Sequence, residues 1–337
     1  MPSKWSKKLF WLVELLILGS AGVLLAQQTA EAPSKLAAEI ARLEQLSGGV
    51  IGVAAVHLES GERVYHNRDM KFPMASTYKV PIAVQLLHRV DQGELTLDSM
   101  IVLQPHDLSP GSGTISRLLD DPGVVLSVRN LLELMLLISD NSATDLMLEL
   151  AGGPAEVNKR MAAINVEGLH IDRSTLKLIA DYVGIRDLPA REDYSQDMFR
   201  EKYKALSEAE REQAEAGFDN DSRDTSTPKA MANLLEKIWQ KQILTEESSE
   251  LLMDIMRRCE TGEHRLKGIL PPGTVVAHKT GTIGGTANDV GVIELPDDAG
   301  HVVTVVFVKE SSLPVADRER AIAHVARAVY DYFLFRK

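Results

Sequence analysis

The stretch MASTYKVP, residues 74–81, carries a serine and a lysine three positions apart, Ser76 and Lys79. It opens an apolar segment, YKVPIAVQLLHRV, which has the spacing of a buried helix. Side chains three apart share one face of a helix, so the lysine amine can reach the serine hydroxyl. A lysine whose pKa is lowered by burial can take the serine's proton and make it a nucleophile. Taken alone, the pattern also fits a serine that caps a helix.

Two further motifs lie downstream. LISDNSATD places Ser139 and Asn141 at the end of an apolar helix, where a capping turn is the alternative interpretation. AHKTGT ends a β-rich run, and its glycine lets a ligand approach the backbone closely. Its candidate binding residues are Lys279, Thr280, Gly281 and Thr282. The lysine and the threonines can hold an anionic group.

The segments around these motifs predict an α+β fold. An amphipathic helix over 32–48 precedes two strands within 50–66, and a predominantly helical block follows from Pro73 to about Arg258. Three β-rich segments and a closing helix complete the chain. We expect an antiparallel sheet built from 33–72 and 262–337, flanked by helices, with 73–261 inserted as an all-α region.

Composition narrows the function. The chain has 337 residues and a formal charge of −11, which argues against nucleic acid as a partner. The single cysteine, Cys259, forbids an intrachain disulfide, and the nine histidines lack metal-binding spacing, so we expect neither metal nor cofactor. Residues 1–26 combine three lysines with an apolar run, which predicts a signal peptide and export to the periplasm or the medium. An uncleaved inner-membrane anchor is the alternative.

The three motifs in this order resemble the class A serine β-lactamase family over about residues 35–335. The segments RDTSTP (223–228) and TGEHRLKG (261–268) extend the resemblance. It implies that a β-lactam acylates Ser76 and that Lys79 and Ser139 move protons. Asn141 would hold the substrate's side-chain amide, and Lys279, Thr280 and Thr282 would line the carboxylate side of the cleft. The backbone N–H groups of Ser76 and Thr282 would form the oxyanion hole. Arg265 stands where some members place a carboxylate-binding arginine; a solvated surface arginine is the alternative.

One segment, HIDRSTLKLIADYVG (170–184), departs from the family. The resemblance aligns Arg173 with the family's loop arginine and Asp224 with its ionic partner. Thr175 stands where the family has the glutamate that activates water, and Ile179 where it has an asparagine. A threonine hydroxyl is too weak a base to replace a carboxylate. The loop 173–224 is also far longer than in the family.

Two hypotheses remain for this extended omega loop. In one, the charged stretch 181–217 brings a replacement carboxylate, with Asp181, Glu192 and Asp193 as the candidates. In the other, the acyl-enzyme clears slowly, and the protein behaves as a penicillin-binding protein or a sensor. A D-alanyl peptidase or esterase using the same residues is a third function. We expect a monomer that takes a small β-lactam or peptidoglycan-like substrate and meets a membrane only through an uncleaved signal.

Overall fold

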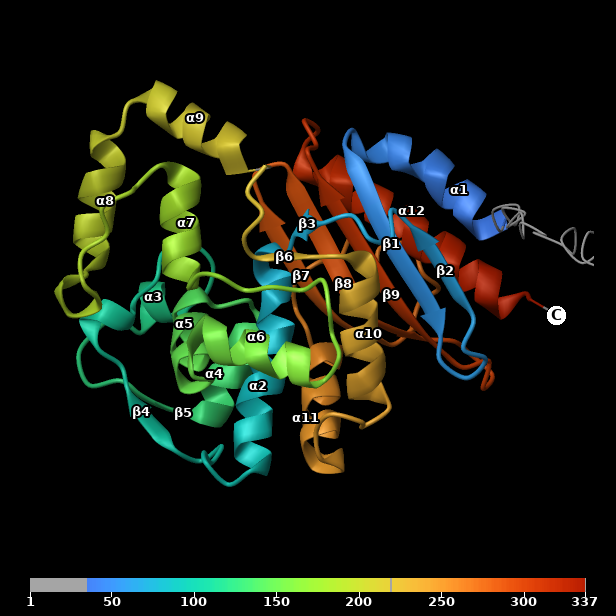
Figure 1. Cartoon of the computed structure of the whole chain (residues 1–337), viewed down its shortest axis with the longest axis horizontal. Coiled ribbons are helices and arrows are strands. Elements are labelled where there is room, and N and C mark those ends of the chain that lie inside the picture. The colour runs from blue at the N-terminus through green and yellow to red at the C-terminus, as the bar shows by residue number, and fades with distance from the viewer. Residues whose placement is uncertain (1–34, 219, 337) are drawn as a thin grey trace, which may run out of the picture. The chain divides into compact units, whose positions relative to one another are not determined.

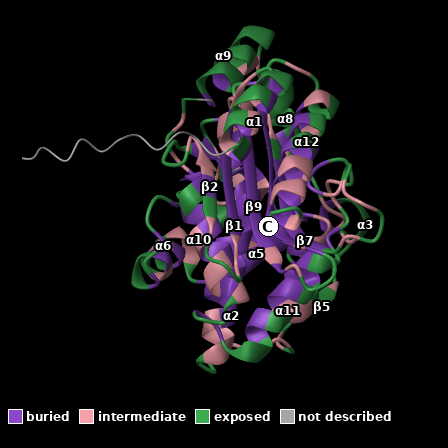
Figure 2. Ribbon diagram, turned by 90° about the vertical axis from the view of Figure 1, so that its right-hand side faces the viewer, coloured by how far each residue is buried: buried purple, intermediate pink, exposed green. Residues whose placement is uncertain are grey.

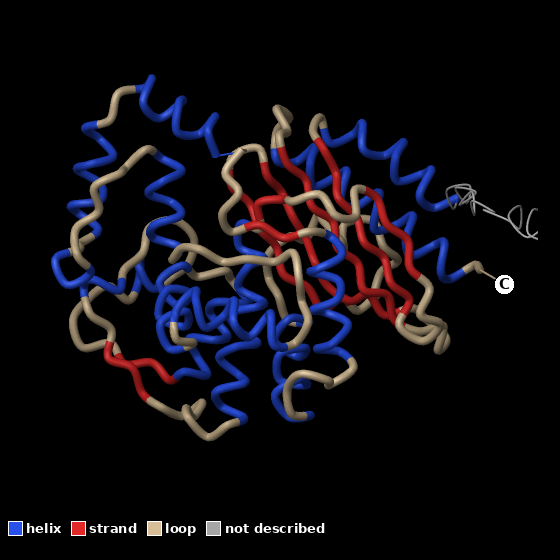
Figure 3. The backbone as a smooth tube through the Cα atoms, in the orientation of Figure 1, coloured by secondary structure: helices blue, strands red, loops and turns tan. Residues whose placement is uncertain are grey.

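The computed structural model describes residues 35–218 and 220–336. The predicted signal segment 1–26 lies outside these residues. Within them, one five-stranded antiparallel sheet has the order β2-β1-β9-β8-β7 (Figures 1 and 3). Its strands are β1 (Val50–His57), β2 (Arg63–His66), β7 (Val276–Ile283), β8 (Thr286–Glu294) and β9 (His301–Lys309). The sheet therefore joins both ends of the chain, which confirms the predicted α+β arrangement.

Helices cover both faces of this sheet, so its central strands are apolar on both sides. Ile51 and Val53 of β1 face the terminal helices α1 (Lys35–Leu43) and α12 (Val315–Leu334). Ala54 and Val56 join the larger core formed with the helical block. Figure 2 shows the strands buried between these layers.

The helical block surrounds helix α2 (Lys79–Asp91), in which every residue from Lys79 to Leu87 is buried. Its other helices are α3 (Ile115–Leu118), α4 (Val128–Leu137), α5 (Asn141–Leu150), α6 (Gly153–Ala163), α7 (Thr175–Val183), α8 (Gln196–Ala205), α9 (Glu208–Phe218), α10 (Pro228–Trp239) and α11 (Glu246–Arg257). The stretch 73–261 also contains short strands, so it is not purely helical. β3 (Phe72–Pro73) pairs with β6 (Thr225–Ser226), and β4 (Met100–Val102) pairs with β5 (Val125–Ser127).

The described part of the long loop 173–224 contains three α-helices, α7, α8 and α9 (Figure 1), and the short 3-10 helix Arg191–Asp193. α7 packs against α5 and α9, and Phe199 and Phe218 anchor the inserted helices through buried rings. Most other residues of α8 and α9 are exposed or half-buried, as their charged sequence predicts (Figure 2). The described helices include none that is both long and apolar enough to cross a membrane.

Candidate active site

Ser76 lies in a 3-10 turn, Ala75–Tyr78, that leads directly into α2. Ala75 adopts a left-handed conformation with φ 46°, a strained geometry for a residue with a Cβ. The side-chain amide of Asn288, on β8, donates to the carbonyls of Pro73 (2.8 Å) and Met74 (3.0 Å). This fully buried asparagine fixes the nucleophile turn to the sheet, and sequence reasoning did not identify it.

Lys79 is completely buried at the start of α2. Its Nζ lies 2.7 Å from the Ser139 carbonyl oxygen, 3.0 Å from Ser139 Oγ and 3.0 Å from Asn141 Oδ1. Burial, and next the nearby charge of Lys279, hold the pKa of Lys79 well below its ordinary value. The amine is therefore suited to accept a proton.

Ser139 and Asn141 flank Asp140, the N-cap of α5. The Asp140 carboxylate accepts hydrogen bonds from the backbone N–H groups of Ala143, Thr114 and Ile115 at 2.7–2.9 Å. The capping interpretation of this motif is thus correct for Asp140. Ser139 and Asn141 instead contact Lys79. Ser139 has a left-handed backbone conformation with φ 60°.

Strand β7 brings the third motif to the same place. Lys279 is fully buried, and its Nζ donates to Ser139 Oγ at 3.0 Å, so the two lysines meet at one hydroxyl. Burial lowers the pKa of Lys279 to about 8. A Cβ on Gly281 would stand 2.9 Å from the Ser76 backbone nitrogen. The strand edge therefore approaches the nucleophile turn too closely for any side chain at this position.

Arg265 is not a solvated surface arginine, since only 5% of it is exposed. Its Nη1 donates to the Gly281 and Asn288 carbonyls (3.1 and 2.8 Å), and its Nε donates to Glu319 (3.0 Å). Its Nη2 donates to Thr282 Oγ1 at 2.6 Å. Arg265 therefore lies behind the exposed Thr282 and orients that hydroxyl.

Thr175 begins α7 and is almost entirely buried. Its hydroxyl contacts the phenol of Tyr78, whose pKa is raised by burial. Its N–H donates to Asp145 Oδ1 at 2.6 Å, and the N–H of Leu176 donates to Oδ2 at 2.9 Å. Burial raises the pKa of the Asp145 carboxyl, although the hydrogen bonds from Thr175 and Leu176 oppose the shift. Tyr78 and Asp145 are neighbours that sequence reasoning did not find.

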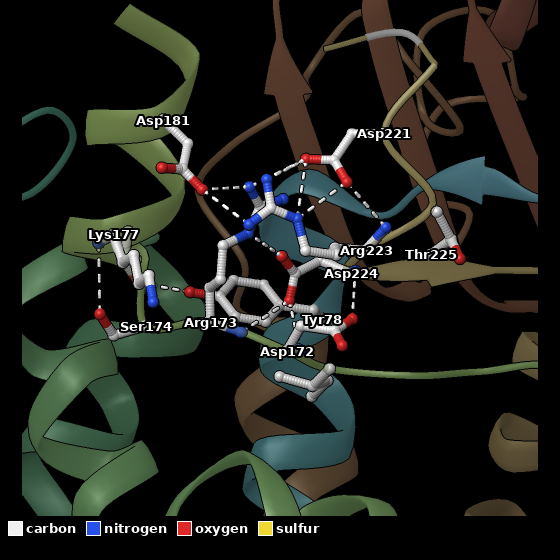
Figure 4. A network of polar contacts seen from close by, with 12 residues as sticks. Tyr78, Asp172, Arg173, Ser174, Lys177, Asp181, Asp221, Arg223, Asp224 and Thr225 are labelled. Carbon is white, nitrogen blue, oxygen red and sulfur yellow. Dashed lines mark hydrogen bonds and ion pairs between the residues drawn. The ribbon is translucent and has the colours of Figure 1, made fainter. Parts of the chain in front are cut away.

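The three candidate replacement carboxylates lie in different surroundings. Asp181 Oδ2 lies 2.8 Å from Arg173 Nη1 and 3.0 Å from Arg223 Nη1 (Figure 4). Its carboxylate is therefore held in ion pairs with two guanidinium groups. Glu192 and Asp193 are exposed, on the turn Arg191–Asp193.

The ionic partner expected for Arg173 is present. Arg173 Nε lies 2.6 Å from Asp224 Oδ2, and both side chains are buried (Figure 4). This pair closes the loop 173–224 at its base. Among the described residues, no group of three or more histidine, cysteine, aspartate or glutamate side chains could hold a metal ion.

Comparison with known proteins agrees with this geometry. Residues 35–333 match the model of the Beta-lactamase enzyme family. The extended-spectrum beta-lactamase PER-1 of Pseudomonas aeruginosa is 34% identical over 292 residues, which cover 84% of this chain and 82% of that protein. Beta-lactamase VEB-1 of the same organism is 30% identical over 293 residues, covering 84% and 85%.

Solved structures show the same fold. A beta-lactamase from Chitinophaga pinensis superposes with a TM-score of 0.72 at 29% identity, covering 88% of this chain and 98% of that one. An ancestral class A beta-lactamase gives 0.71 at 31% identity, with the same coverage. The chain belongs to the class A serine β-lactamase family.

Proposed function

We propose that this protein hydrolyses β-lactams through an acyl-enzyme on Ser76. The observation that carries the proposal is the meeting of Lys79 and Lys279 at the hydroxyl of Ser139, next to the nucleophile turn. The relatives named above are β-lactamases, which supports the same reaction class here.

Lys79 Nζ contacts three acceptors, the Ser139 carbonyl, Ser139 Oγ and Asn141 Oδ1. Burial and the nearby charge of Lys279 hold the pKa of Lys79 well below its ordinary value. We infer that Lys79 is the amine that takes the proton of Ser76, and that Lys279 keeps its charge and donates to Ser139 Oγ.

The acylation step follows from this arrangement. Ser76 Oγ attacks the lactam carbonyl while its proton passes to Lys79, and the backbone N–H groups of Ser76 and Thr282 stabilise the oxyanion. Ser139 donates its proton to the departing lactam nitrogen and regains one from Lys79. The substrate carboxylate binds Lys279, Thr280 and Thr282, the last of which is oriented by Arg265. Asn141 holds the substrate amide.

Deacylation has weaker support from the residues present. The hydroxyls of Thr175 and Tyr78 bind each other, and a neutral hydroxyl does not take a proton from water at neutral pH. Asp181 forms ion pairs with Arg173 and Arg223. We infer that Lys79 also activates the deacylating water, and that this step is slower than acylation. A persistent acyl-enzyme, as in a penicillin-binding protein or sensor, is the second candidate, favoured by the Thr175–Tyr78 contact.

The test is the intact mass of the mature protein over time after mixing with benzylpenicillin, with Ser76→Ala as the control. An adduct that forms and clears while antibiotic is consumed supports hydrolysis. A persistent adduct supports the second candidate. No adduct on the native chain, alongside turnover of a D-alanyl-D-alanine ester, would replace both with the peptidase or esterase function.

We further propose that the chain is exported and acts as a monomer in the periplasm or outside the cell. The lysines and apolar run of residues 1–26 support export. Mass measurement of the protein recovered from the periplasm distinguishes removal of residues 1–26 from a retained anchor. Light scattering of the mature chain tests the monomer.

A further inference from the structure

One face of α7 lies near the candidate active-site residues. Thr175, Ile179 and Tyr182 are spaced four and three residues apart and share that face. Thr175 contacts the nucleophile turn through Tyr78. A Cβ on Gly111 would stand 2.8 Å from Asn141 Nδ2 and 3.3 Å from Ile179 Cδ1. Ile179 therefore lies beside the residue proposed to hold the substrate's side-chain amide.

One turn of helix further on, Tyr182 reaches the turn between β7 and β8. A Cβ on Gly284 would stand 3.1 Å from Tyr182 Cε2 and 3.3 Å from its hydroxyl. The ring thus contacts the backbone two residues beyond Thr282. That contact joins α7 to the β7–β8 turn, and we call the place where they meet the closed end.

The β7–β8 turn is held in place from its other side. Arg318 of α12 donates to the Gly284 carbonyl at 2.6 Å, and the N–H of Ser311 donates to the Gly285 carbonyl at 3.2 Å. Gly284 itself has φ 49°, a conformation that favours glycine. The β7–β8 turn is thus bonded to Arg318 and Ser311 on one side and contacts Tyr182 on the other.

Tyr182 is supported by the inserted helix α9. Its hydroxyl donates to Glu215 Oε1 at 2.5 Å, and its ring meets Phe218 edge-to-face with centroids 5.3 Å apart. Behind it, a Cβ on Gly184 would touch Ala214 at 3.4 Å. Phe218 and Ala214 are buried, whereas Glu215 is exposed. The insertion thus holds the side chain that forms the closed end.

We propose that Tyr182 determines substrate specificity, and that Glu215 and Phe218 are the residues that position it. Resting on the function proposed above, this inference assigns a role to the loop insertion. Ile179 and Tyr182 form an apolar wall beside the acyl side chain, and the Tyr182–Gly284 contact limits its size. The preferred substrates are β-lactams with a small or flat apolar acyl group, and bulky branched groups are excluded.

The experiment compares two probes of different size. The first is 6-aminopenicillanic acid, which has no acyl side chain, and the second is a penicillin with a 2,6-dimethoxyphenyl side chain. The second-order rate of Ser76 acylation is measured for each by intact mass, and the ratio of branched to bare substrate is the readout. Tyr182→Ala should raise this ratio about tenfold or more, the scale of steric discrimination in apolar pockets.

The positioning role is tested on α9, whose exposed carboxylate can be changed without disturbing the core. Glu215→Ala should raise the ratio in the same direction, whereas Glu215→Gln, which keeps an acceptor for the tyrosine hydroxyl, should retain the native ratio. Glu212→Ala, another exposed glutamate on α9, is the matched control and should leave the ratio unchanged. If Tyr182→Ala fails to fold, Glu215→Ala still decides the question.

Two results would overturn the inference, and they are distinguishable. If the bare nucleus acylates Ser76 but the ratio stays within about twofold of native in Tyr182→Ala, or in Glu215→Ala where Tyr182→Ala does not fold, the closed end does not select substrates. If neither probe acylates the native protein, the proposed function itself fails, and the inference falls with it.

Discussion

Replacing Arg173 with methionine should destabilise the loop that carries Thr175, Ile179 and Tyr182. The Arg173 side chain is only 2% exposed. Besides Asp224, its guanidinium bonds Asp181 at 2.8 Å and Asp221 at 3.0 Å. Methionine fills a similar volume but supplies no charge, so the change isolates the ionic role.

The cost follows from what remains after the arginine is removed. Asp224 is 3% exposed and would keep only the N–H groups of Asp172 and residue 173 (2.7 and 3.1 Å). Removing one partner of a buried ion pair costs about 3–5 kcal/mol. Asp181 and Asp221 keep Arg223, at 3.0 and 2.7 Å. We therefore expect the lower end of that range, about 3 kcal/mol.

Urea unfolding gives the global change, and hydrogen exchange shows whether residues 173–224 open first. Arg186→Met is the matched control, because Arg186 also pairs with Asp181 but is 67% exposed and lies 3.8 Å from that carboxylate. This variant should lower the free energy of unfolding by less than about 1 kcal/mol. Arg173→Met combined with Asp224→Asn should recover part of the loss, since no buried charge is left unpaired. A loss below about 1 kcal/mol in Arg173→Met, with unchanged exchange in the loop, would refute the reasoning.

Three further predictions concern the chemistry. Lys279 loses its charge as the pH rises through about 8, so its bond to the substrate carboxylate weakens and KM should rise above that pH. Lys279→Arg, which stays charged, should remove this alkaline rise in KM. An unchanged rise in that variant would contradict the role of Lys279. Gly281→Ala would place a Cβ 2.9 Å from the Ser76 nitrogen and should slow adduct formation by about a hundredfold while the thermal melt shows a folded protein. Thr175→Glu combined with Asp145→Asn, which avoids two adjacent carboxylates, should shorten the lifetime of the Ser76 adduct by about a hundredfold or more, and an equal lifetime would show that the missing carboxylate is not what limits deacylation.

Much of the site was predictable from the sequence because its motifs are local. The spacing of Ser76 and Lys79 predicts that they share a helix face, and the structure places Ser76 in the 3-10 turn that leads into α2, at whose start Lys79 lies. The apolar periods predict the main helices and strands. The expected pairing of Arg173 with Asp224 is present at the base of the loop. The sequence itself shows Thr175 at the position where the family has the glutamate that activates water.

Other features depended on packing between distant segments. Lys79 and Lys279 meet at one hydroxyl, Arg265 turns inward to Thr282, and Tyr182 reaches Gly284.

Periodicity shows that a helix face is buried, but it does not show which residue covers it. The sequence by itself therefore determined the family, the main helices and strands of the sheet, and the candidate chemistry of this protein. Only the tertiary structure decided how deeply each lysine is buried, which carboxylates form ion pairs with arginines, and which side chain contacts the β7–β8 turn, because burial and charge neighbours depend on contacts across the fold.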